Sequence, residues 1–132
     1  MEEWKDIKGY EGKYMISNLG NIKSLWYIQH NQFPIPRNQK IYREKVLSVY
    51  DNGTGYKFVN LQINGKKKKH YIHRLVAEHF LEKREGANVI NHKDYNPSNN
   101  EASNLEWCTQ KENILYSIEH YRKKKKWKSN QY

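Results

Sequence analysis

Cysteine is nearly absent from this chain, because Cys108 is the single one among 132 residues. One thiol forms neither an intramolecular disulfide nor a cysteine-based zinc cluster, which excludes disulfide-stapled secreted domains and zinc fingers. Cys108 stands between Trp107 and Thr109, where a small buried hydrophobe is expected rather than a nucleophile.

Long hydrophobic runs are also missing. No stretch approaches the roughly 18 apolar residues of a membrane helix. No apolar segment follows Met1 as it does in a signal peptide. We therefore expect a protein of a reducing cytoplasm that has no membrane partner.

The charge, by contrast, is large and of one sign. Lys and Arg number 24 against 14 for Asp and Glu, which gives a formal net charge of +10. A balance this basic indicates a polyanionic partner, and nucleic acid is the commonest one. Apolar residues make up only 36% of the chain, so the core must be thin.

The first half of the chain is patterned as an antiparallel β meander. Tyr14, Ile16 and Ile22 alternate around turn residues, which predicts two short strands. Asn64-Gly65 predicts a two-residue hairpin turn, because both positions require a positive φ. Residues 66–72 are the expected return strand.

Two further strands and one loop are predicted in this half. Residues 46–51 read as a strand, and residues 58–63 alternate as another. Residues 27–43 contain Pro34 and Pro36 and show no clean period, so we predict a loop there.

The second half is predicted to combine short strands with two helices. Residues 73–81 have helical spacing, and residues 89–90 and 105–108 are expected to pair across a long polar loop. Thr109 and Glu112 form a capping box that begins the second helix. The apolar stripe of that helix comprises Ile114, Leu115, Ile118 and Tyr121. The basic residues 122–132 are expected to fray.

Three polar residues stand out as candidates for chemistry. His92 follows the first strand of this half, Asn104 ends the polar loop, and Asn113 lies in the first turn of the capped helix. A strand–loop–strand arrangement can bring Asn104 beside His92, and the cap turns Asn113 back towards the strands. The spacing therefore allows all three to converge on one small site.

At these positions the sequence resembles the HNH (ββα-metal) endonucleases, and particularly the phage HNH homing endonucleases. The matching segments are His73–Ala77, Val89–Asp94, Asn99-Asn100, Asn104–Trp107 and Glu112-Asn113. A second set resembles the small N-terminal DNA-binding module of these enzymes: Trp4–Ile7, Gly9–Gly12, Tyr14, Ser17-Asn18 and Gly20. Together the two matches cover most of the chain.

The resemblance implies a role for each site residue. His92 would deprotonate the water that attacks the scissile phosphate, since an imidazole titrates near neutrality. Asn104 would hold the His92 ring in its productive orientation. Asn91 and Asn113 would ligate one divalent cation, Mg²⁺ or alternatively Mn²⁺, which polarises the phosphate and stabilises the departing 3′ oxygen.

Asn91 keeps an alternative open. Many members of the family have Asp or His at this position, and a carboxylate would bind the ion better. The alternative is a nucleic-acid-binding or regulatory protein that keeps an HNH scaffold but is catalytically weak or inactive. A basic RNA-binding module would explain the charge, but not the spaced set of Asn91-His92, Asn104 and Asn113.

The expected fold class is α+β, with an N-terminal antiparallel β module that binds DNA (1–68), a ββα-metal nuclease unit (69–121) and a basic tail (122–132). The expected partner is double-stranded DNA, in a bacterial or phage-infected cell. The residues expected to contact it are Lys66, Lys67, Lys68, Lys69, Lys93, Arg122, Lys123, Lys124, Lys125 and Lys126. A monomer is expected, with a dimer as the alternative. A monomer with one site would nick one strand, and a double-strand break would need a dimer or two events.

Overall fold

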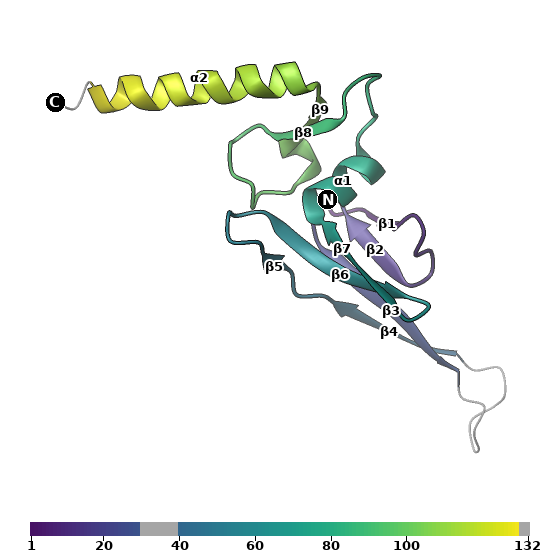
Figure 1. Ribbon diagram of the computed structural model, residues 1–132. Coiled ribbons are helices and arrows are strands. Elements are labelled where there is room, and N and C mark those ends of the chain that lie inside the picture. The colour runs from purple at the N-terminus through teal and green to yellow at the C-terminus, as the bar shows by residue number, and fades with distance from the viewer. Residues whose placement is uncertain (30–39, 130–132) are drawn as a thin grey trace.

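The computed structural model in Figure 1 describes the backbone of residues 1–29 and 40–129 and the side chains of residues 1–25 and 44–123. This part of the chain folds into three antiparallel sheets and two α-helices, which confirms the α+β class. None of its helices is both long enough and apolar enough to cross a membrane.

The first sheet is an antiparallel meander of β1 (Trp4–Asp6), β2 (Tyr14–Ser17), β3 (Ile22–Gln29) and β4 (Lys40–Val46), in that order. The loop predicted over 27–43 was wrong at both ends, because 27–29 and 40–43 are strand. Tyr27 pairs with Tyr42 and Ile28 with Ile41. Such cross-strand pairs stabilise a strand beyond the point where local periodicity reveals it. Residues 30–39 lie outside the described residues.

The second sheet comprises β5 (Tyr50–Asp51), β6 (Lys57–Ile63) and β7 (Lys66–Tyr71), with β6 in the centre. Its hairpin turn was predicted correctly, since Asn64 has φ 52° and Gly65 φ 76°. The strand predicted over 46–51 is wrong in its middle: the chain leaves β4 at Val46 and enters β5 only at Tyr50. Between Val46 and Tyr50 the chain passes from the first sheet to the second, which divides the segment that the sequence pattern predicted as one strand.

The helix predicted over 73–81 is α1 (Ile72–Phe80), and the predicted strands are β8 (Val89–His92) and β9 (Leu105–Cys108). A 3₁₀ turn, η1 (Ala102–Asn104), precedes β9, and α2 (Gln110–Ser129) follows it.

The capping box at the start of α2 is confirmed. The Thr109 N–H donates to Glu112 Oε1 at 3.0 Å, and the Glu112 N–H donates to Thr109 Oγ1 at 3.1 Å. The backbone of residues 122–129, in the tail that was expected to fray, is helical, because α2 continues to Ser129. An ion pair one turn apart, Lys123 with Glu119 at 3.3 Å, supports that extension. Figure 1 shows α2 projecting away from the sheets.

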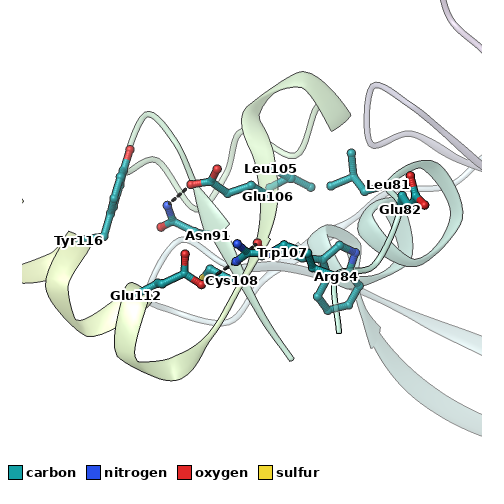
Figure 2. A pocket seen from close by; sticks show the side chains of 10 residues that line it. All are labelled: Leu81, Glu82, Arg84, Asn91, Leu105, Glu106, Trp107, Cys108, Glu112 and Tyr116. Atoms are coloured by element: carbon teal, nitrogen blue, oxygen red, sulfur yellow. Dashed lines mark hydrogen bonds and ion pairs between the residues drawn. The ribbon is translucent and has the colours of Figure 1, made fainter. Parts of the chain in front are cut away.

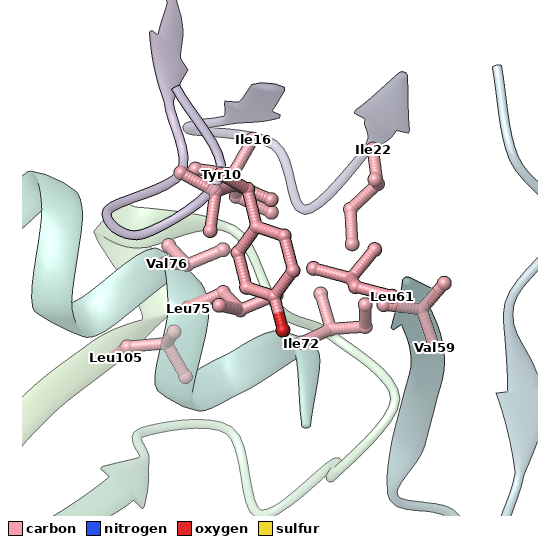
Figure 3. Packing of buried hydrophobic residues seen from close by; sticks show 10 residues of the cluster. Tyr10, Ile16, Ile22, Val59, Leu61, Ile72, Leu75, Val76 and Leu105 are labelled. Atoms are coloured by element: carbon pink, nitrogen blue, oxygen red, sulfur yellow. The ribbon is translucent and has the colours of Figure 1, made fainter. Parts of the chain in front are cut away.

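One hydrophobic core joins the two halves of the chain (Figure 3). Apolar side chains from the first sheet pack with those of β6, α1 and β9 in a single buried cluster. Its members are Ile7, Tyr10, Ile16, Ile22, Val59, Leu61, Ile72, Leu75, Val76 and Leu105. Because α1 lies in the centre of this cluster, the β8–β9 hairpin is anchored to the N-terminal sheet.

Candidate active site

A pocket of about 610 Å³ brings together three of the four predicted site residues. Asn91 and His92 line it from the end of β8, and Asn113 lines it from the first turn of α2. Asn104 is not among its lining residues. Of the three residues whose spacing predicted convergence, His92 and Asn113 therefore meet in this pocket and Asn104 does not; Asn91, which the resemblance implied, lies there with them.

His92 is held by an asparagine that the sequence analysis gave no role. The imidazole is only 7% exposed, and its Nε2 lies 2.9 Å from Oδ1 of the buried Asn100. An amide oxygen can only accept, so Nε2 carries the proton and donates it to Asn100. In the neutral ring the lone pair is then on Nδ1, which is the atom available to act as a base.

Asn104 does not hold the His92 ring, contrary to the expectation. Its Oδ1 accepts from the Asp94 N–H at 3.1 Å, and its Nδ2 donates to Asp94 Oδ1 and to the Asn99 carbonyl, each at 2.9 Å. Its carbonyl accepts from the Lys93 N–H at 2.8 Å. Because these partners occupy the buried amide, Asn104 braces the loop that follows His92 and not the ring itself.

Asp94 is the charged centre of that brace. Hydrogen bonds lower the pKa of its carboxyl group, first the one from Asn99, then those from the Asn96 backbone and Asn104. The carboxylate is therefore committed to the loop.

On the other side of the pocket, the amide of Asn91 is oriented by a carboxylate. Asn91 and Glu106 are cross-strand partners, and Asn91 Nδ2 donates to Glu106 Oε1 at 3.1 Å, the contact drawn in Figure 2. Since a carboxylate only accepts, Nδ2 must face Glu106, and Oδ1 is left free to bind a cation.

A second pocket of about 450 Å³ lies next to Asn91 (Figure 2). Glu106, Arg84 and Glu112 line it, and Arg84 pairs with Glu112. Cys108 also borders it; burial raises the pKa of its thiol, which fits the expected buried hydrophobe and not a nucleophile.

The residues present fit a weakly held hard cation. The amide oxygens of Asn91 and Asn113 are ligands that Mg²⁺ accepts, although both are neutral. No cluster of three His, Cys, Asp or Glu side chains that could hold a metal occurs in the described part of the chain. The nearest negative charge that the strands supply to Asn91 is Glu106, one hydrogen bond away.

Two aromatic rings to which the sequence analysis gave no role lie against His92. Ring centroids of His73 and Tyr56 lie 5.3 and 5.9 Å from that of His92, and both residues line the 610 Å³ pocket. Burial lowers the pKa of His73 to about 4, so this ring is neutral at cellular pH. His92 therefore has no cationic neighbour in His73. The signal for His73 was its place in the matching segment His73–Ala77.

The described residues among the predicted DNA contacts are exposed and lie on three parts of the fold. Lys66–Lys69 project from β7, an edge strand, while Arg122 and Lys123 lie on α2. Lys93 is exposed beside the site, where its Nζ donates to the Ser103 carbonyl at 3.3 Å. The side chains of residues 124–126 lie outside the described residues. Contact of these cations with DNA stays a prediction.

Comparison with protein families matches two parts of the chain. Residues 70–115 match the model described as HNH endonuclease, and residues 2–62 match the NUMOD4 motif. These bounds lie close to the halves described above, one on each side of the β6–β7 hairpin.

Individual relatives agree with these matches. The chain is 41% identical over 112 residues to the DNA endonuclease I-HmuI of Bacillus phage SP01, which covers 85% of this chain and 55% of that protein. It is 37% identical over 125 residues to an uncharacterized HNH endonuclease of Acanthamoeba polyphaga mimivirus, which covers 89% of this chain and 26% of that protein. The chain thus spans about half or less of the length of these relatives.

A prophage protein and a solved structure extend the likeness. A putative HNH homing endonuclease of the SPbeta prophage of Bacillus subtilis is 31% identical over 94 residues, which covers 70% of this chain and 52% of that protein. The solved structure of the HNH homing endonuclease I-HmuI, which concerns DNA binding and cleavage, superposes with a TM-score of 0.70 at 39% identity. That match covers 89% of this chain and 59% of the other.

Proposed function

Because this chain belongs to the HNH endonuclease family, we propose that it is a metal-dependent DNA endonuclease that hydrolyses phosphodiester bonds, with a homing-endonuclease-like mode of action. The observation that carries the proposal is the convergence of Asn91, His92 and Asn113 in one pocket. A basic RNA-binding module or a purely structural fold would not need these three polar side chains together.

His92 acts as the general base. While its Nε2–H donates a hydrogen bond to Asn100, the ring would accept a proton from the attacking water at Nδ1. Because the neighbouring His73 is neutral, it does not repel the positive charge that His92 gains when it takes up the proton.

Asn91 and Asn113 hold the cation, for which we propose Mg²⁺, with Mn²⁺ as the substitute. When bound, the cation supplies Lewis-acid polarisation of the phosphate and stabilises the departing 3′ oxygen. Glu106 binds the Asn91 Nδ2 and would thereby leave the Asn91 oxygen available to a bound cation. Asn104 acts indirectly, by fixing the loop after His92.

Double-stranded DNA is the proposed substrate, and the lysines of β7 together with Lys93 and the basic part of α2 are the proposed phosphate contacts. A monomer has one such site, so we propose that it nicks one strand at a time.

The test is relaxation of supercoiled plasmid and of phage genomic DNA with Mg²⁺, with Mn²⁺ and with EDTA, for the wild type and His92→Ala. We expect cation-dependent nicking that falls by about 10²- to 10⁴-fold in His92→Ala, the usual contribution of a general base, while gel-shift affinity for DNA is retained. A wild type that binds DNA but cuts none of these substrates would support the inactive-scaffold alternative. Equal cutting by His92→Ala would refute its role as base.

A further inference from the structure

The residue that holds His92 is itself held by the N-terminal half of the chain. Asn100 is 6% exposed and lies in the loop between β8 and β9. The turn between β2 and β3, residues 18–21, packs directly against this loop. The Ala102 N–H donates to the Asn18 carbonyl at 2.7 Å, two residues beyond Asn100.

Gly20 makes the closest approach in this contact. A Cβ built on Gly20 would lie 3.1 Å from Asn100 Cβ and 3.2 Å from the Asn100 carbonyl oxygen. Real Cβ atoms seldom come this close, so any larger residue at position 20 would push Asn100 by a few tenths of an ångström. Gly20 has φ +88°, a conformation that already favours glycine.

A second contact from the N-terminal half fixes the same loop. Ser98 Oγ donates to the Gly55 carbonyl at 2.7 Å, and a Cβ on Gly55 would meet Pro97 Cγ at 2.8 Å. Figure 1 shows the loop between β8 and β9 reaching down to the turn between β5 and β6. Two turns of the N-terminal half therefore enclose the segment that carries Asn100.

We propose that Asn100, seated against the Gly20 turn, is the positioning residue for His92, so that the N-terminal module sets the orientation of the base in the nuclease unit. Asn100 is not among the residues that line the 610 Å³ pocket; it acts through the His92 ring. The inference rests on the proposed role of His92, but its structural part is testable without catalysis.

The first experiment reads the histidine ring directly. Long-range ¹H–¹⁵N spectra above pH 8, in EDTA, distinguish the two neutral tautomers, and a His92→Gln spectrum assigns the His92 signals. We expect the Nε2–H form for wild-type His92, the same form in Asn100→Asp, which keeps the acceptor, and a tautomer mixture in Asn100→Leu. An Nδ1–H form in the wild type, or an unchanged form in Asn100→Leu, overturns the proposal.

The second experiment tests the coupling, with a matched pair of variants. Gly20→Ala and Gly9→Ala impose similar backbone strain, since Gly9 has φ +89°, but nothing lies within 4 Å of a Cβ at Gly9. We expect Gly20→Ala to lower kcat by roughly threefold to tenfold relative to Gly9→Ala, with KM unchanged, as small misplacements of reacting groups do. The His92 spectrum should change in Gly20→Ala alone.

These readouts separate two kinds of failure. If no variant cuts DNA but the His92 spectra follow the expected pattern, the proposed function is wrong and the positioning contact stands. If Gly20→Ala matches Gly9→Ala in both kcat and the His92 spectrum, the coupling is refuted. Thermal unfolding of Asn100→Leu, Asn100→Asp and wild type confirms that the compared samples are folded.

Discussion

The two sides of the pocket are built in different ways. On the base side, His92 is 7% exposed and is enclosed by Asn100, His73 and Tyr56, which come from three distant parts of the chain. On the metal side, Asn113 sits on α2, whose apolar stripe is exposed; Tyr121, for example, is 67% exposed.

Helix α2 is joined to the body by polar and aromatic contacts at its first turns and not by the core. The Tyr116 hydroxyl donates to the Lys93 carbonyl at 2.9 Å, and His120 stacks on Tyr95 with ring centroids 3.7 Å apart. The difference teaches that folding already fixes His92 and Asn91, whereas Asn113, the other proposed metal ligand, lies on a helix that the core holds less firmly.

Among the tests of this comparison, the largest effect is expected from a variant that changes only the metal side of the pocket. Asn113→Ala removes one of the two proposed neutral ligands, so the Mg²⁺ concentration for half-maximal cleavage should rise on the order of 100-fold, the upper range seen when groups supporting a metal are lost. DNA affinity in EDTA and the His92 spectrum should not change. A change in the His92 spectrum would show that the two sides are not independent.

A charge swap sharpens the comparison at Asn91. In the double variant Asn91→Asp with Glu106→Gln, the negative charge moves from the supporting residue to the ligand, and an amide-to-carboxylate hydrogen bond can be kept. We expect roughly tenfold tighter Mn²⁺ binding by calorimetry, because the charge now contacts the ion. Glu106→Gln alone should weaken binding by about tenfold. Equal affinities in all three proteins would contradict the role given to Glu106.

The smallest effect concerns the stability of the base side. The pKa of His73 is about 4 in the folded protein and 6.5 when unperturbed, because burial disfavours the charged ring. The unfolded chain therefore binds this proton first, and the free energy of unfolding should fall as pH drops from 6.5 towards 4. The full difference between the two pKa values corresponds to at most about 3 kcal/mol. Because the ring is only partly buried, solvent screening reduces the expected loss to about 1 kcal/mol. In urea unfolding across this pH range, the free energy of unfolding should fall less in His73→Gln than in the wild type. An equal fall in both proteins would show that His73 is not the cause.

Local patterns predicted most of the fold and part of the site. The Asn64-Gly65 turn and the Thr109–Glu112 capping box are short-range signals, and both were correct. The ends of β3 and β4 were missed because their pairing depends on a partner strand, as between Tyr27 and Tyr42, and not on neighbours in sequence.

Within the site, spacing correctly brought His92 and Asn113 together, but it did not identify the hydrogen-bond partners of His92 and Asn104. Asn104 and Asn100 are both buried asparagines of the same loop, and sequence alone does not tell which amide faces the ring. In the structure, the amide of Asn104 is hydrogen-bonded to the N–H and the carboxylate of Asp94. The amide of Asn100 is therefore the one that binds His92. Glu106 was overlooked because its role depends on register, which places it opposite Asn91.

The shared core limits how such an enzyme can be redesigned. Ile16 and Ile22 of the first sheet, Ile7 just after β1 and Leu75 of α1 belong to one cluster, so a chimera that exchanges only the N-terminal sheet would leave part of this interface unmatched. Retargeting by grafting therefore has to transplant the facing side chains of α1 and the Gly20 turn as well. The segments to exchange together are those that pack against each other in this interface. Their limits differ from the boundary between the two family matches, which falls in the β6–β7 hairpin.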